Sequence, residues 1–223
     1  MDQKYLDKIN DFAEKLGLVS SSDRGKNHFG YLKKKEDNYI YEFYCLMRIS
    51  SDLKQNYNIE LENAGSEIRF PGKPASKSDG WSYFLIKEKN SGNRLFQMCL
   101  GTKISLSFAS GTTVAPDISI QVPDAGDTPD EKSVLLVMDA KYSTKPDSSL
   151  SISQIREFAQ IVNDLEVQDA ENVSLFFYKL AGLTGNCLIT NKKGNSKHSV
   201  YCKKRSVKQV SKFLEDVQFE IVG

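Results

Sequence analysis

The stretch SVLLVMDAK, residues 133–141, decides the fold expected for this chain. Its nearly continuous apolar run is typical of a central strand that is buried on both faces. The stretch before it, TVAPDISIQV at 113–122, alternates polar and apolar residues as a strand does. Residues 123–132 between the two are rich in Pro, Gly and Asp and favour a turn. The sequence therefore predicts a hairpin whose second strand lies deep in a sheet.

The segments around this hairpin predict a mixed α/β domain. Helical spacing of apolar residues predicts helices at 3–16, 38–56 and 151–168, and Ser151 is a candidate N-cap for the last of these. The remaining patterns predict strands at 57–61, 66–70, 81–87, 94–107 with a break near Gly101, 173–179, 187–190 and 199–202, followed by a helix near 206–216. The helix at 151–168 would cross from the end of the hairpin to the strand at 173.

Composition fits a globular domain of ordinary character. The chain has 223 residues, of which 39% are hydrophobic, and its net charge is +1. We divide it into residues 1–37, an N-terminal helix and polar connection, and residues 38–223, the main domain. The four cysteines form no CxxC pair and are interpreted as reduced, mostly buried thiols. No segment resembles a signal peptide or a membrane span, so a cytoplasmic protein is expected.

Charged residues at the end of the apolar strand are the first candidates for chemistry. Asp139 and Lys141 are two residues apart, so on a strand their side chains project to the same side. Pairing of the two hairpin strands would also bring Asp117 beside Asp139. Two adjacent carboxylates repel each other unless a cation lies between them, and hard oxygen ligands suit Mg²⁺ or Mn²⁺. The alternative is a simple ion pair at a strand end.

These residues form a recognisable pattern. Pro116-Asp117 is followed 22 residues later by Asp139-Ala140-Lys141, and this resembles the motif of the PD-(D/E)XK nuclease superfamily. The phrase VMDAKY at 137–142 is similar to the McrC-type, restriction-endonuclease-like branch. The resemblance implies a restriction-endonuclease-like αβββαβ core, with a mixed central sheet flanked by helices. It also implies Mg²⁺-dependent hydrolysis of DNA.

The resemblance assigns roles to the residues that match its motif. Asp117 would be the central metal ligand and Asp139 the second carboxylate ligand, with the carbonyl of Ala140 joining the metal shell. Lys141 would orient the attacking water or help to deprotonate it, and would steady the negative charge of the phosphate.

Three further residues are less clearly assigned. In many members of this superfamily a glutamate on the first core helix completes the site, and Glu42 is its match. A residue on the helix surface is an equal alternative for Glu42. Gln154 corresponds to a glutamine found on the helix after the motif strand, although a glutamine in a first helical turn is unremarkable. Tyr142 either contacts the phosphate or ends the strand.

Basic residues offer candidate contacts to nucleic acid. We expect the 191–208 segment to be a basic hairpin that contacts the DNA backbone through Lys192, Lys193, Lys203, Lys204 and Arg205. The alternative is a solvated face that binds nothing.

Three hypotheses for the function follow. The first is a metal-dependent endonuclease that cuts DNA in restriction, defence or mobile-element processing. The second is a nuclease-fold DNA-binding or assembly subunit that is active only with a partner, or not at all. The third is an interaction protein in which residues 1–37 dock on a partner ATPase, a methylase or a second nuclease subunit. A homodimer is a further expectation, because such nucleases often pair to cut both strands.

Overall fold

A computed structural model describes residues 3–19, 32, 35–62, 68–145, 147–167, 172–173, 176–177, 180, 183–213 and 220–222. Its centre is an eight-stranded sheet with the strand order β1-β2-β3-β6-β7-β8-β9-β10. The strands of this sheet are β1 (Tyr57–Glu62), β2 (Tyr83–Glu88), β3 (Arg94–Leu100), β6 (Ile118–Gln121), β7 (Val134–Lys141), β8 (Asn186–Thr190), β9 (Val207–Ser211) and β10 (Glu220–Val222). A separate two-stranded ribbon consists of β4 (Ile104–Ser105) and β5 (Thr113–Val114).

The main helices are α1 (Gln3–Leu16), α2 (Asp37–Leu53), α3 (Ile152–Asp164) and the short α5 (Ser199–Lys204). Single turns of 3₁₀ helix in the described part of the chain include η3 (Lys77–Asp79), η4 (Glu131–Ser133) and η5 (Ser196–His198). The predicted helices at 3–16, 38–56 and 151–168 correspond to α1, α2 and α3. Ser151 caps α3 as expected, because its side chain accepts a hydrogen bond from the backbone N–H of Gln154.

The sheet is mixed, which confirms the predicted α/β class. From β1 through β2, β3 and β6 to β7, each strand pairs antiparallel with the next. Strands β7, β8 and β9 pair in parallel, and β10 pairs antiparallel with β9. Parallel neighbours need a crossover, and α3 lies within the connection from β7 to β8.

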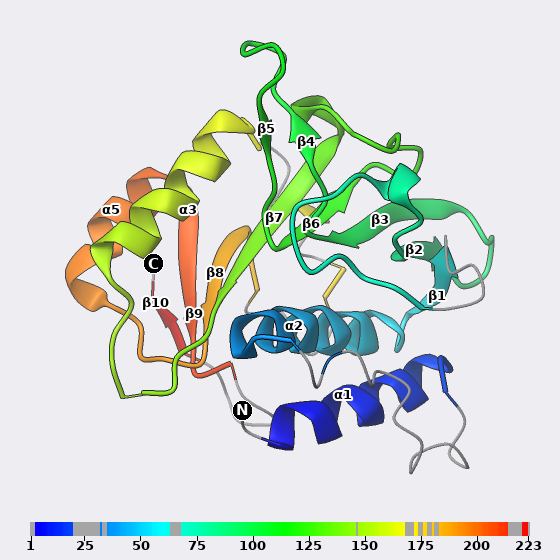
Figure 1. The fold of residues 1–223 in the computed structure, drawn as a ribbon, viewed down its shortest axis with the longest axis horizontal. Coiled ribbons are helices and arrows are strands. Elements are labelled where there is room, and N and C mark those ends of the chain that lie inside the picture. Colours follow the sequence, from blue (N-terminus) through cyan, green and yellow to red (C-terminus); the bar gives the residue numbers. More distant parts are fainter. Residues whose placement is uncertain are drawn as a thin grey trace.

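Apolar side chains cover both faces of the sheet. Figure 1 shows α2 lying between the sheet and α1. The core on this face joins buried residues of both helices to Leu136, Met138 and Ala140 of β7. On the other face, Val137 packs with α3 and α5. Strand β7 is therefore buried on both sides, as its apolar sequence predicts.

The predicted hairpin forms, and its register places Asp117 opposite Asp139. Ile118 of β6 pairs with Met138 of β7 in the antiparallel ladder. One step beyond this pair, the same register sets Asp117 against Asp139. Since directly opposed residues of an antiparallel pair project to the same face, the two acids share one side of the sheet.

Several predicted elements in the C-terminal part of the chain are wrong. The segment 199–202, predicted as a strand, belongs to helix α5, and the helix predicted near 206–216 begins as strand β9. The basic segment 191–208 is thus a crossover between parallel strands and not a hairpin. Of the strand predicted at 173–179, Val173 is helical and Phe176 lies in a turn. Of that predicted at 66–70, residues 68–70 are not in a strand. Phe177 is in neither a helix nor a strand, and the rest of both segments lies outside the described residues.

A buried lysine ties a loop to the face of the sheet opposite α2. Lys77 is only 3% exposed. Its Nζ donates to Oε1 of Gln97 at 2.6 Å and to Oε1 of Gln121 at 3.2 Å. These amide oxygens replace the water that the ammonium loses on burial. The segment around Lys77 is therefore held across β3 and β6.

The cysteines agree with the sequence interpretation, since all four are buried and none is in a disulfide. Among the described helices, none is both long enough and apolar enough to cross a bilayer.

Packing of α3 makes a direct prediction about stability. Phe158 is fully buried between α3 and the sheet, whereas its neighbour Glu157 is exposed. We expect Phe158→Ala to lower the free energy of unfolding by about 3–5 kcal/mol, because it leaves a cavity. Glu157→Ala should change it by less than about 0.5 kcal/mol. Urea denaturation followed by circular dichroism measures both, and equal losses would contradict this packing.

Candidate active site

Lys141 and Asp139 form an ion pair at the end of β7. The Lys141 Nζ lies 2.5 Å from Oδ2 of Asp139. The Asp139 side chain is only 7% exposed and that of Lys141 is 27% exposed. Their separation of two residues on one strand puts both on the same side, as the sequence predicts.

Asp117 joins this pair from the residue that precedes β6. Its Oδ2 lies 3.9 Å from the Lys141 Nζ and accepts a hydrogen bond of 2.7 Å from the backbone N–H of Ala140. In an extended strand the N–H and C=O of one residue point to the same side. The Ala140 carbonyl therefore faces the Asp117 side of β7 as well.

Glu42 reaches the same place from the first half of α2. Burial raises the pKa of its carboxyl to about 7, and the charge of Asp139 acts in the same direction while that of Lys141 opposes it. These interactions require Glu42 to lie near both residues. Glu42 is partly buried, and its role as a metal ligand stays a prediction.

The electrostatics of the cluster follow from the crowding of its acids. Burial raises the pKa of Asp117 well above its usual range, and the neighbouring charge of Asp139 and a hydrogen bond to it add to this effect. Burial alone would lower the pKa of Lys141, but the charges of Asp139, Asp117 and Glu42 outweigh burial and raise it. The Lys141 ammonium thus supplies the counter-charge that the acids require.

The donors match a hard divalent cation in chemistry. Carboxylates of Asp117, Asp139 and Glu42 and the carbonyl of Ala140 are the oxygen ligands that Mg²⁺ and Mn²⁺ prefer. Among the described residues, however, no three His, Cys, Asp or Glu side chains are gathered in a geometry that would hold a metal ion. In this arrangement the Lys141 Nζ contacts Asp139 directly, so coordination of a metal by that oxygen requires the lysine to move.

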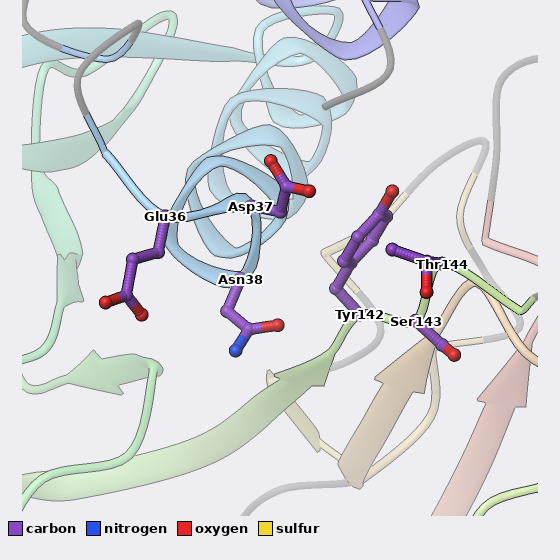
Figure 2. Close-up of a pocket in the computed structure, with 6 residues that line it drawn as sticks. All are labelled: Glu36, Asp37, Asn38, Tyr142, Ser143 and Thr144. Carbon is purple, nitrogen blue, oxygen red and sulfur yellow. The ribbon is translucent and has the colours of Figure 1, made fainter.

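A cleft opens beside the cluster. It has a volume of about 490 Å³ and is lined by Glu36, Asp37, Asn38, Tyr142, Ser143 and Thr144. Figure 2 shows the first three residues at the start of α2 and the other three just after β7, with the Glu36 side chain directed away from Tyr142. Asn38 precedes Glu42 by one helical turn, and Tyr142 directly follows Lys141. Both walls of the cleft are therefore continuous with the candidate site.

Two residues of the site were missed by sequence reasoning. The Thr190 hydroxyl donates to the carbonyl of Lys141 at 2.6 Å. The Asn191 side chain bonds both backbone groups of Ser143 at 2.9 Å and 2.8 Å. The only signal in the sequence was their place directly after the apolar run CLI at 187–189.

Gln154 caps a helix and Tyr142 packs in an aromatic cluster while it also lines the cleft, so a contact of Tyr142 with the phosphate stays a prediction. The Gln154 side chain accepts from the backbone N–H of Ser151 at 3.1 Å and completes a capping box at the start of α3. Within the described contacts it bonds to Ser151 alone, so the predicted catalytic role is not supported. The Tyr142 ring packs against Tyr5 and Tyr41, as expected for a residue that ends the strand.

The predicted basic cluster is divided between two edges of the sheet. Lys192 and Lys193 follow β8, whose last residue, Thr190, pairs with Lys141. They therefore lie at the edge that carries the candidate site. The other members precede Val207, which pairs with the first residue of β8, so they lie toward the opposite edge; they are Lys203, Lys204 and Arg205.

Comparisons of the chain with protein-family models, curated proteins and solved structures gave no match.

The raised pKa of Glu42 predicts a dependence of stability on pH. Because this pKa rises from 4.5 to about 7 on folding, the stability due to protonated Glu42 is complete below pH 4.5 and is lost as the pH rises through 7. In EDTA, Glu42→Gln should therefore gain roughly 2–3 kcal/mol relative to wild type between pH 4.5 and pH 8. Urea denaturation across this range measures the difference, and exposed Glu157→Gln is the control. A difference that is flat with pH would contradict the placement of Glu42.

Proposed function

We propose that the protein is a metal-dependent nuclease of the PD-(D/E)XK type that hydrolyses phosphodiester bonds in DNA. One observation carries this proposal: Asp117, Asp139 and Lys141 converge where β6 begins and β7 ends. These are the positions that the motif requires.

The order of elements around the cluster also supports the proposal. The elements α2, β3, β6, β7, α3 and β8 follow an αβββαβ order, with β1 and β2 inserted before β3 and the β4–β5 ribbon inserted before β6. Asp117 directly precedes the second strand of this order, Asp139 lies on the third, and Glu42 lies on the first helix. A parallel strand, β8, completes the edge beside Lys141. The resemblance to the PD-(D/E)XK superfamily implies the same αβββαβ order.

The chemistry assigns each residue a task. Asp117, Asp139 and Glu42 would hold Mg²⁺ or Mn²⁺ together with the Ala140 carbonyl. When bound, such an ion lowers the pKa of a coordinated water and polarises the phosphate. Lys141 would place its positive charge beside the phosphate oxygens, and would orient the attacking water or help to deprotonate it.

The biological setting rests on the resemblance of the motif. It suggests restriction, defence or mobile-element processing by a cytoplasmic enzyme, with a homodimer or a partner ATPase or methylase as possible assemblies. The alternative, a DNA-binding or assembly subunit that needs a partner for activity, predicts no cleavage by the purified chain.

Cleavage assays test the proposal directly. Plasmid, linear duplex, single-stranded DNA and RNA are incubated with the protein in Mg²⁺, Mn²⁺ or EDTA, and products are separated on gels. We expect metal-dependent cleavage of DNA that falls on the order of 10³-fold in Asp139→Asn and in Lys141→Ala, because each removes charge that acts in the transition state.

Asp124→Asn is the matched control, because Asp124 is an exposed aspartate away from the cluster. It should retain the wild-type rate. Survival of every substrate in both metals would contradict the nuclease, and so would a rate that Asp139→Asn leaves unchanged.

The division of the basic cluster predicts which lysines contact the substrate. The double variant Lys192→Ala/Lys193→Ala should weaken DNA binding and reduce the slope of log K against log salt by about 1–2, because two phosphate contacts are lost. The triple alanine variant at 203, 204 and 205 should keep the wild-type slope. Fluorescence anisotropy in Ca²⁺ measures both, and a larger change in the triple variant would reverse the assignment.

A further inference from the structure

We propose that Thr190 and Asn191 are positioning residues that hold Lys141 in place by bonding the backbone on both sides of Tyr142. The proposal rests on the proposed nuclease function for its consequence in catalysis, but its structural part can be tested without any cleavage. Neither residue belongs to the motif that suggested the function.

Thr190 secures the backbone of Lys141 itself. Its hydroxyl donates to the Lys141 carbonyl at 2.6 Å and also accepts from the backbone N–H of Lys192 at 3.1 Å. Thr190 is fully buried. It pairs with Lys141 in the last rung of the parallel ladder between β7 and β8. The hydroxyl therefore adds a bond where the regular ladder ends.

Asn191 secures the chain two residues further on. Its Oδ1 accepts from the N–H of Ser143 at 2.9 Å, and its Nδ2 donates to the carbonyl of the same residue at 2.8 Å. A side-chain amide that bonds both backbone groups of one residue acts as an extra rung of the sheet. Asn191 is 4% exposed, so water does not compete for these bonds.

These bonds matter because of what Lys141 must do. Its Nζ lies 2.5 Å from one acid and 3.9 Å from the other, and it must face a phosphate as well. Lys141 is the last residue of β7, where a strand otherwise frays. A flexible lysine stem delivers its charge reproducibly only if its Cα is fixed, and a displacement of about 1 Å can cost on the order of 10²-fold in rate.

A double-mutant cycle separates positioning from a general structural role. In the full-length protein, Thr190→Val removes the hydroxyl at nearly constant volume, and Thr190→Ser keeps it. We expect Thr190→Val to lower kcat on the order of 10–100-fold with KM within about threefold. Thr190→Ser should remain within about threefold of wild type. In the Lys141→Ala background, Thr190→Val should have almost no further effect, because the residue it positions is gone.

A second measurement reads the position of Lys141 without substrate. In protein labelled with ¹⁵N at lysine, the Lys141 ammonium signal, assigned by its loss in Lys141→Ala, should exchange slowly with water in the wild type because of its pair with Asp139. Exchange should be faster in Thr190→Val and in Asn191→Asp, which lacks the Nδ2 donor, and unchanged in Thr190→Ser. Circular dichroism checks that each variant is folded. If Thr190→Val does not fold, Asn191→Asp is the variant that tests the proposal.

The outcomes distinguish this inference from the nuclease itself. An equal loss of kcat from Thr190→Val in both backgrounds would show a general structural role and overturn it. Unchanged ammonium exchange in the folded variants would overturn it too. If the wild type cleaves no substrate while the variants exchange faster, the nuclease proposal fails and the positioning of Lys141 stands.

Discussion

The close placement of the carboxyl groups of Asp117 and Asp139 is the constraint on which the rest of this structure depends. The antiparallel register sets the two carboxyls directly opposite each other at a largely buried sheet end. Left alone, they would repel each other and resist ionisation. The Lys141 ammonium pairs with Asp139, and the backbone N–H of Ala140 donates a hydrogen bond to Asp117. Glu42 of α2 and the polar residues Thr190 and Asn191 at the end of β8 add to an arrangement that an ordinary strand end does not need.

The sequence was sufficient for the hairpin and its acids because both depend on local periodicity. A period of two along β6 and β7 fixes which side chains share a face, and the apolar run of β7 requires a strand that is covered on both sides. Helices α1, α2 and α3 could also be predicted, from their apolar stripes and from Ser151 at the start of α3. Once these elements are given, the meeting of Asp117, Asp139 and Lys141 follows from register alone.

The secondary structure of the C-terminal part could not be predicted from the sequence, because it is decided by pairing with distant residues. The sequence SVYCKK at 199–204 contains Val200 and Tyr201, which favour strands, yet it forms α5 because the parallel strands β8 and β9 need a crossover between them. Apolar residues such as Val173 and Phe177 are buried in any secondary structure, so burial did not reveal their conformation. Thr190 and Asn191 were missed for the same reason, since their partners lie 49 and 48 residues earlier in the chain.

The parallel pairing of β7 with β8 has a consequence for the newly made chain. The residues of the cluster and their supports extend from Glu42 to Asn191, and the last of them lies beyond α3 in sequence. During synthesis from the N-terminus, the hairpin with its acids leaves the ribosome well before β8 exists. The lysine stem is therefore unsupported in the nascent chain. The bonds from Thr190 and Asn191 can form only after β8 has been synthesised, so along the chain Lys141 precedes its backbone supports.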